Sequence, residues 1–181
     1  MAKEAAKEKI YKEILTKDYI QNLIMAAPMH DIGKVTIPDA ILQKAGKLTT
    51  EEYKIMKTHA EKGSEIIKST FGSVGDEEYE KIAYEVAYYH HEKWDGSGYP
   101  TGKKAYEIPL CARIMAIADV FDALSSSRCY KEPMPLKQCF EIIKNDAGQG
   151  FDPLLVEIFL QNRRQIEKIC EENNGKKEYF L

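Results

Sequence analysis

The residues best suited to chemistry in this chain are its histidines and a few aspartates. The sequence holds four histidines, and the first of them, His30, is followed directly by Asp31. Gly33 and Lys34 come next, and an apolar run at residues 20–29 precedes the pair. A helix end with a polar cap is the alternative interpretation of this stretch alone. Because mixed imidazole and carboxylate ligation suits iron, manganese, nickel, cobalt or zinc, the pair also suggests a metal site.

The other three histidines lie in segments that could bring them to the same place. His59 stands in the middle of a predicted helix, and His90 and His91 are adjacent at the end of another. Each also has a structural interpretation. His59 alone is better explained as a core histidine with a satisfied hydrogen bond, and the twin histidines could complement a helix dipole. The metal hypothesis therefore depends on all four converging.

Asp119 is the most informative carboxylate, because it stands in the apolar stretch 114–121. An ionised carboxylate inside an apolar helix costs several kcal/mol unless something compensates it. Arg113 is the structural candidate for a partner, and a metal ion is the alternative. Asp122 is expected at the solvated edge of the same helix. The candidate ligand set is therefore His30, Asp31, His59, His90, His91 and Asp119.

Such a set could hold two metal ions that act together on a phosphorus centre of a substrate. Two metals about 3.5–4 Å apart stabilise the entering and leaving oxygens of an in-line attack. A water bound between them has a lowered pKa and can act as hydroxide near neutral pH. The substrate side then needs cations that are not ligands, and Lys34, Arg128 and Lys131 are the candidates. Arginine grips phosphate oxygens in pairs and lysine acts as a point charge. A solvated helix end is the alternative for Arg128 and Lys131.

Helices must position these residues, since the sequence shows helical spacing and no persuasive strand alternation. Residues 3–16 predict an amphipathic helix. Asp18 is expected to cap the next helix, which runs through His30 with a kink at Pro28. Gly33 suits the exit of that helix. The His30–Asp31 pair is thus expected at a helix end.

The rest of the chain is also predicted to be helical. Thr49 and Glu52 form a capping box for a helix that runs to about residue 69. Residues 95–102 are dense in glycine and proline and must be irregular. Further helical segments are expected at 38–42, 77–91 and 109–124 and after Pro135 and Pro153, before a frayed polar tail at 171–181. The fold class is therefore all-α, with about seven helices.

Composition bounds the class of protein. With 181 residues, of which 44% are hydrophobic and 30% charged, residues 1–181 are expected to form one globular domain. The net charge of −3 argues against DNA or RNA as a partner but allows a small anionic substrate. Cys111, Cys129, Cys139 and Cys170 form no CxxC pair, so reduced thiols and a cytoplasmic location are expected. Neither a signal peptide nor a membrane-spanning run is found.

The motifs together resemble the HD-GYP subgroup of the HD-domain metal-dependent phosphohydrolases. The resemblance covers about residues 19–160, and its combination of motifs is very specific. It implies an all-helical HD-domain bundle around a binuclear, sometimes trinuclear, metal site. The implied activity is hydrolysis of cyclic di-GMP, a bacterial second messenger, to linear pGpG or on to GMP. The matching stretches are MAAPMHDIGK (25–34), IPDAILQKAGKLTTEEYKIMKTH (37–59), YYHHEKWDGSGYP (88–100), IPLCARIMAIADVFDALSSSRCYK (108–131) and GQGFDPLLV (148–156).

The resemblance also implies roles for individual residues. Asp31 would bridge two divalent ions, iron or manganese in the first place, with nickel, cobalt or zinc as alternatives. Asp31 and Lys34 would be catalytic. The implied metal ligands are His30, Asp31, His59, His90, His91 and Asp119. The implied contacts to substrate phosphates are Lys34, Arg128 and Lys131. Gly98, Tyr99 and Pro100 would form a signature loop beside the cyclic dinucleotide substrate or a partner-protein surface.

One departure from the family pattern concerns the N-terminal side. Family members usually carry a further metal-binding histidine well upstream of the HD pair, and no histidine precedes His30 here. The first family helix is therefore expected to be missing or replaced by residues 3–16, and no third metal is expected. Two other functions stay open. One is an HD hydrolase on another phosphoester, such as a mixed cyclic dinucleotide. The other is a degenerate domain that senses nucleotide or binds a partner through the Tyr99 loop.

Overall fold

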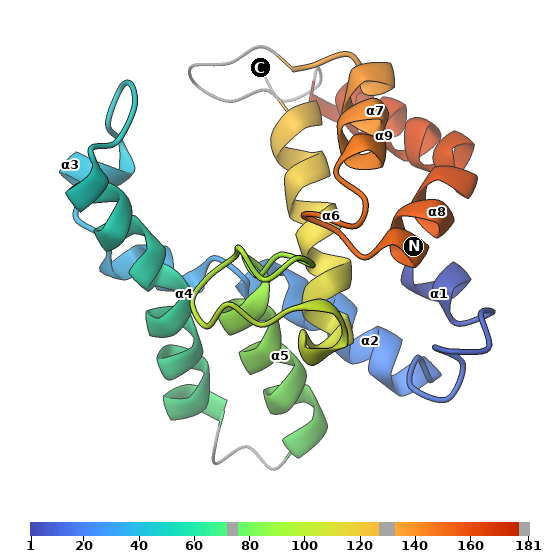
Figure 1. The fold of residues 1–181 in the computed structure, drawn as a ribbon, viewed down its shortest axis with the longest axis horizontal. Helices are drawn as coiled ribbons and strands as arrows, with labels where there is room; N and C mark the ends of the chain where they lie inside the picture. The colour runs from blue at the N-terminus through green and yellow to red at the C-terminus, as the bar shows by residue number, and fades with distance from the viewer. Residues whose placement is uncertain (72–75, 127–132, 178–181) are drawn as a thin grey trace.

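The computed structural model describes residues 1–71, 76–126 and 133–177, and within these ranges the protein is all-α, as predicted (Figure 1). The described residues form nine α-helices, against the expected seven or so, and three 3₁₀ turns. The 3₁₀ turns are Ala27–Met29, Ile32–Thr36 and Ala105–Glu107. The α-helices are α1 (Ala2–Ala5), α2 (Lys17–Ala26), α3 (Asp39–Leu42), α4 (Thr50–Phe71), α5 (Glu77–Tyr89), α6 (Leu110–Ser125), α7 (Leu136–Asn145), α8 (Pro153–Gln161) and α9 (Arg163–Lys177).

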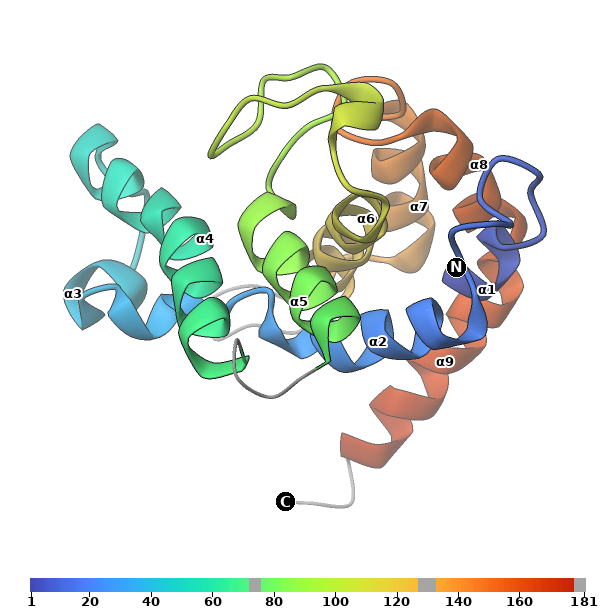
Figure 2. The same ribbon diagram turned by 90° about the horizontal axis from the view of Figure 1, so that it is seen from below.

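Helix α6 is the centre of the fold. All its residues from Leu110 to Ile117 are buried, and apart from Arg113 they are apolar, as expected for a helix surrounded by the core. Figure 2, in which α6 is seen nearly end-on, shows α5 and α7 on its two sides. Three phenylalanine rings from α6, α7 and α8 meet in the core with centroids 5.2–5.3 Å apart, Phe121, Phe140 and Phe159. Full burial of each such ring contributes about 1.5–3 kcal/mol.

Helices α4 and α5 pack against each other beside this core, and α4 also packs against the Ile32–Thr36 turn. The predicted capping box of α4 is confirmed: Glu52 N–H donates to Thr49 Oγ1 over 3.2 Å, and Thr49 N–H donates to Glu52 Oε2 over 2.7 Å. Gly33 is needed where the turn meets α4, because a Cβ there would lie 1.9 Å from the carbonyl oxygen of His59. The expectation that Gly33 ends a helix is therefore wrong, since its role is to allow this close approach.

The N-terminal segment differs from the prediction. Only α1 is helical in residues 3–16, and a series of turns follows it. The predicted helix would have buried the face that carries Ile10 and Ile14, which are 51% and 46% exposed. Tyr11 and Leu15 are buried instead. Burial of these two side chains in the core therefore overrides the helical pattern of the sequence.

Two other helix boundaries also differ. Helix α2 is capped by Thr16, whose Oγ1 accepts from Tyr19 N–H, and not by Asp18. It ends at Ala26 rather than His30, because Pro28 lies in a separate 3₁₀ turn. Helix α9 was not predicted and extends to Lys177, through the first part of the tail expected to be frayed. The segment has few apolar residues, so no clear helical pattern is found in its sequence. Among the described helices, none is long and apolar enough to cross a membrane.

Candidate metal centre

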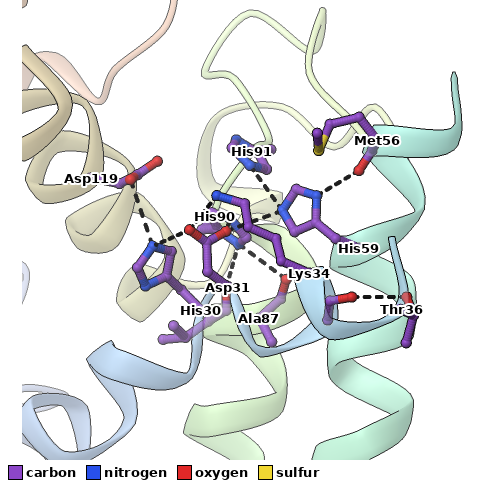
Figure 3. A network of polar contacts seen from close by, with 12 residues as sticks. His30, Asp31, Lys34, Thr36, Met56, His59, Ala87, His90, His91 and Asp119 are labelled. Carbon is purple, nitrogen blue, oxygen red and sulfur yellow. Dashed lines mark hydrogen bonds and ion pairs between the residues drawn. The ribbon is translucent and has the colours of Figure 1, made fainter. Parts of the chain in front are cut away.

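Four segments that are distant in sequence bring the predicted ligands together (Figure 3). His30 and Asp31 lie between the first two 3₁₀ turns, where the chain changes direction after α2. His59 comes from the middle of α4. His90 caps the end of α5, and His91 follows it. Asp119 comes from α6, so it completes the set predicted from the sequence.

Asp31 lies at the centre of the group, and its two carboxylate oxygens face different partners. Oδ1 lies 3.5 Å from His59 Nε2 and 3.9 Å from His90 Nε2. Oδ2 lies 3.2 Å from His30 Nε2. Single ligand atoms of Asp31, His59, His90 and His91 all fall within 4.8 Å of one another. One carboxylate therefore stands between two groups of ligand atoms, as a bridging ligand must.

Hydrogen bonds to the backbone fix the ring orientation of three of the histidines. Nδ1 of His30 lies 2.8 Å from the carbonyl oxygen of Ala27, and Nδ1 of His59 lies 2.7 Å from that of Met56. Nδ1 of His90 lies 3.0 Å from two carbonyl oxygens at the end of α5. Because a carbonyl can only accept, each Nδ1 carries a proton and donates it. When these rings are neutral, Nε2 is left with a lone pair aimed into the cluster, which is how metal-binding histidines are commonly held.

The cluster has buried polar atoms that the protein itself does not satisfy. Asp31 Oδ1 and His90 Nε2 are both buried and have no hydrogen-bond partner. Nε2 of His91 and Nε2 of His59 are only 3.2 Å apart. Two nitrogens bound to one ion at about 2.0–2.1 Å each would be separated by roughly 3 Å. The orphaned atoms and the close nitrogens both fit a divalent transition-metal ion.

Electrostatics divide the histidines into two kinds. Burial lowers the pKa of His90 to about 4 and that of His91 to about 3, with the neighbouring imidazoles adding to the effect. Burial also lowers the pKa of His59. Burial would lower the pKa of His30 as well, but hydrogen bonds to Asp119 and Asp31 outweigh it and raise that pKa to about 10. Without metal, one imidazolium therefore occupies the carboxylate-rich side of the cluster.

The two carboxylates that face His30 are correspondingly acidic. Burial alone would raise the pKa of Asp31, but hydrogen bonds from His30 and Lys34 hold it well below its usual range. Burial likewise opposes ionisation of Asp119, and the contact with His30 lowers its pKa nevertheless. Both aspartates are therefore charged near neutral pH, which is the state a metal ligand requires.

Asp119 is less buried than its sequence context predicts, and its side chain is 22% exposed. Its Oδ1 lies 3.6 Å from His30 Nε2. The structural alternative, a pair with Arg113, is wrong: Arg113 Nη1 donates to Asp152 Oδ2 over 2.6 Å. Asp122 is exposed, as expected for the edge of α6.

Of the predicted phosphate-contacting cations, the structure describes Lys34, whose Nζ lies 2.5 Å from Asp31 Oδ2. Its side chain is 38% exposed, so its ammonium stands at the open edge of the cluster. Arg128 and Lys131 lie outside the described residues. Of the three predicted cations, the structure therefore places Lys34 at the cluster, and the roles of Arg128 and Lys131 remain predictions from the sequence.

The predicted signature loop lies against the cluster. The Tyr99 ring stacks on His91 with centroids 4.7 Å apart and planes inclined by 27°. It also meets His59 edge to face at 6.5 Å. Pro100 is exposed, whereas Gly98 and Tyr99 are half-buried. Tyr99 therefore contacts two candidate ligands directly.

Glu92 is a residue of this region that the sequence interpretation did not single out. It is 3% exposed, and its Oε1 accepts from Thr101 N–H at 2.7 Å and from the Thr101 hydroxyl at 2.6 Å. Its Oε2 is buried with no hydrogen-bond partner. The sequence feature that could have identified Glu92 is its position directly after two histidines.

Comparison with known proteins gives consistent matches. Residues 3–155 match the family described as HD domain. This match includes residues 3–18, which the resemblance found in the sequence did not cover. The chain is 46% identical over 150 residues to a cyclic di-GMP phosphodiesterase of Vibrio cholerae, covering 83% of this chain and 30% of the relative. It is 43% identical over 155 residues to a cyclic di-GMP phosphodiesterase of Thermotoga maritima, covering 86% and 41%.

A relative named for a different substrate matches about as well. The chain is 46% identical over 145 residues to 3'3'-cGAMP-specific phosphodiesterase 2 of Vibrio cholerae, covering 80% of this chain and 26% of the relative. The chain thus spans between about a quarter and two fifths of the length of these curated relatives.

Proposed function

The chain belongs to the HD-domain family, within its HD-GYP subgroup, and on this premise we propose that it is a metal-dependent phosphodiesterase acting on cyclic di-GMP. The products would be pGpG, GMP or both. The observation that supports this proposal best is the placement of Asp31, whose two oxygens face separate groups of ligand atoms. A carboxylate so placed suits a pair of ions better than one.

We assign the ligands to two groups that share Asp31. The first group joins Oδ1 of Asp31 to the Nε2 atoms of His59 and His90, and His91 joins it through Nε2, which lies beside that of His59. The second group joins Oδ2 of Asp31 to His30 and Asp119. Iron or manganese is the proposed metal, with nickel, cobalt or zinc as alternatives. Such ions would supply an activated water and would stabilise the charge that develops on phosphate oxygens.

The protein's own residues would then bind and orient the substrate. Lys34 is assigned to a phosphate oxygen, because its ammonium lies at the open edge of the cluster beside Asp31. Arg128 and Lys131 are assigned the same role on the family resemblance alone. The Gly98–Pro100 loop would border the substrate or a protein partner. A cytoplasmic location also stays a proposal from the sequence.

Two assays test this function. Metal content is measured in protein purified without chelator, and the metal-loaded protein is then incubated with cyclic di-GMP while products are followed by chromatography. We expect about two ions per chain and the appearance of pGpG or GMP. Protein that is fully loaded with manganese or iron but leaves cyclic di-GMP unaltered would refute the proposed substrate.

A mixed cyclic dinucleotide is the second candidate substrate, favoured by the similarity to the 3'3'-cGAMP-specific relative. The ligand cluster cannot distinguish the two, because its proposed role is toward the phosphate and not toward the base. Parallel incubations with the two dinucleotides separate them. A degenerate module that senses nucleotide or binds a partner is favoured only if the chain binds less than one ion and neither manganese nor iron restores activity.

A further inference from the structure

His91 is held differently from the other three histidines. His30, His59 and His90 each place Nδ1 against a backbone carbonyl oxygen. Within the described residues, no such hydrogen bond is found for Nδ1 of His91. The polar contact found for the His91 ring is between its Nε2 and Nε2 of His59. A metal-binding histidine normally needs a second contact that fixes the orientation of its ring. Among the described residues, the orientation of the His91 ring is therefore left to contacts other than a backbone hydrogen bond.

The aromatic ring of Tyr99 is placed to provide such a contact. It stacks on the His91 ring at 4.7 Å, while His90 lies against His91 with centroids 4.0 Å apart. Tyr99 N–H donates to the His91 carbonyl oxygen over 3.2 Å, so backbone and ring of Tyr99 are tied to the same residue. The His91 ring thus has aromatic neighbours that restrict its rotation.

The loop that carries Tyr99 is itself tightly fixed to the backbone beside His91. A Cβ on Gly98 would lie 2.3 Å from Lys93 N and 2.6 Å from the His91 carbonyl oxygen, so this approach requires glycine. On the far side of Tyr99, Thr101 donates twice to the buried Glu92 carboxylate. The loop is therefore held on both sides of Tyr99 by residues 91–93, which directly follow His90.

We propose that Tyr99 is a positioning residue that sets the orientation of the His91 ring, and that the contact between Glu92 and Thr101 keeps Tyr99 in place. The importance of His91 as a ligand rests on the proposed metal centre, but the orientation of its ring is a property of the metal-free protein. The signature loop would then serve the metal site itself in addition to any contact with substrate.

The first test uses metal-free protein and histidine ring NMR. Because the chain has four histidines, their ring signals can be assigned with single histidine substitutions. In Tyr99→Leu we expect the His91 ring signals to lose the shift caused by the stacked ring, while those of His30 and His90 stay in place. Tyr99→Phe should keep the wild-type His91 signals. Tyr106→Leu is the matched control, because Tyr106 contacts Trp94 and Arg113. Unchanged His91 signals in folded Tyr99→Leu would overturn the proposal.

The second test measures metal affinity by calorimetric titration with Mn²⁺. Removal of a group that orients a ligand typically costs 10–100-fold in affinity, so Tyr99→Leu should bind the ion at the His91 group about 10-fold or more weakly. Tyr99→Phe and Tyr106→Leu should bind as the wild type does. Thr101→Val, which removes one of the two donors to Glu92, should give a smaller loss in the same direction. Equal affinity in the wild type and in Tyr99→Leu would contradict the proposal.

The two tests also separate this inference from the proposed function. If the wild type binds no metal, the metal centre is wrong, and the NMR comparison still decides the role of Tyr99. If the wild type binds metal and Tyr99→Phe behaves like Tyr99→Leu, removal of the hydroxyl alone explains the loss and stacking is refuted. Should Tyr99→Leu fail to fold, Thr101→Val decides: His91 signals and metal affinity unchanged from the wild type would refute the role assigned to the Glu92–Thr101 contact.

Discussion

Replacement of Asp31 by asparagine removes the charge that both groups of ligands share while it keeps the shape of the side chain. Asp31 Oδ1 lies 3.5 Å from His59 Nε2, and Oδ2 lies 3.2 Å from His30 Nε2. An amide offers one neutral oxygen in place of two charged ones and is a poorer ligand for transition metals. Asp31→Asn should therefore weaken both metal positions together, as no other single substitution in the cluster would.

The expected size of the effect follows from the removal of a ligand that both ions share. Removal of a supporting group outside the ligand set costs 10–100-fold in metal affinity, so removal of a ligand should exceed about 100-fold, or roughly 2.7 kcal/mol. Metal ions contribute several kcal/mol to stabilising the transition state. Since each 1.36 kcal/mol changes the rate tenfold, turnover should fall by at least about 10³-fold.

The assay is titration of metal-free protein with Mn²⁺, followed by hydrolysis measurements on the loaded protein. Asp122→Asn is the matched control, because Asp122 is exposed on α6 and its Oδ1 accepts from the hydroxyl of Ser126 over 3.0 Å. The control should keep wild-type affinity and turnover. Full metal content in Asp31→Asn, or loss of only one of two ions, would refute the bridging role.

Three further substitutions test other parts of the structure. Lys34→Ala should keep its metal but lose about 10–100-fold in kcat/KM, because a hydrogen bond to a charged group is worth about 1.5–3 kcal/mol; loss of metal would show instead that Lys34 supports Asp31. Arg113→Met should lower the free energy of unfolding by about 3–5 kcal/mol, because it leaves Asp152 charged and buried; denaturant unfolding checks this, and a loss below about 1 kcal/mol would contradict it. Gly33→Ala should cost about 1–3 kcal/mol or more and weaken Mn²⁺ binding, because its Cβ would collide with α4; unchanged unfolding and titration curves would count against that packing.

The helical class and a group of candidate ligands could be identified from the sequence because the signals are local. Capping residues and proline positions mark the start of α4 and α8, and His30, His90 and His91 stand near helix ends. Convergence of distant segments is different, since spacing alone does not show which helix faces which. The structure brings His30, His59 and His90 around Asp31, as the sequence suggested. Whether they hold metal is a proposal that the experiments above test.

Several of the features that escaped prediction depend on long-range packing. Tyr11 donates to Asp152 over a separation of 141 residues, and this buried contact holds the N-terminal segment in turns where its pattern favoured a helix. The Asp152 carboxylate also accepts a hydrogen bond from Arg113, so Arg113 is not the partner of Asp119. Gly33 was assigned to a helix exit because its contact with α4 is tertiary. The helical spacing of apolar residues does not show which side chains pair with each other, or where two segments of backbone come into close contact.

Anomalous diffraction from crystals grown with Mn²⁺ tests the bridged pair of ions most directly. We expect two metal peaks, each about 2 Å from one oxygen of Asp31. One peak should be bound by His59, His90 and His91, and the other by His30 and Asp119. A single peak, or peaks from which Asp31 is absent, would contradict a metal pair bridged by this carboxylate.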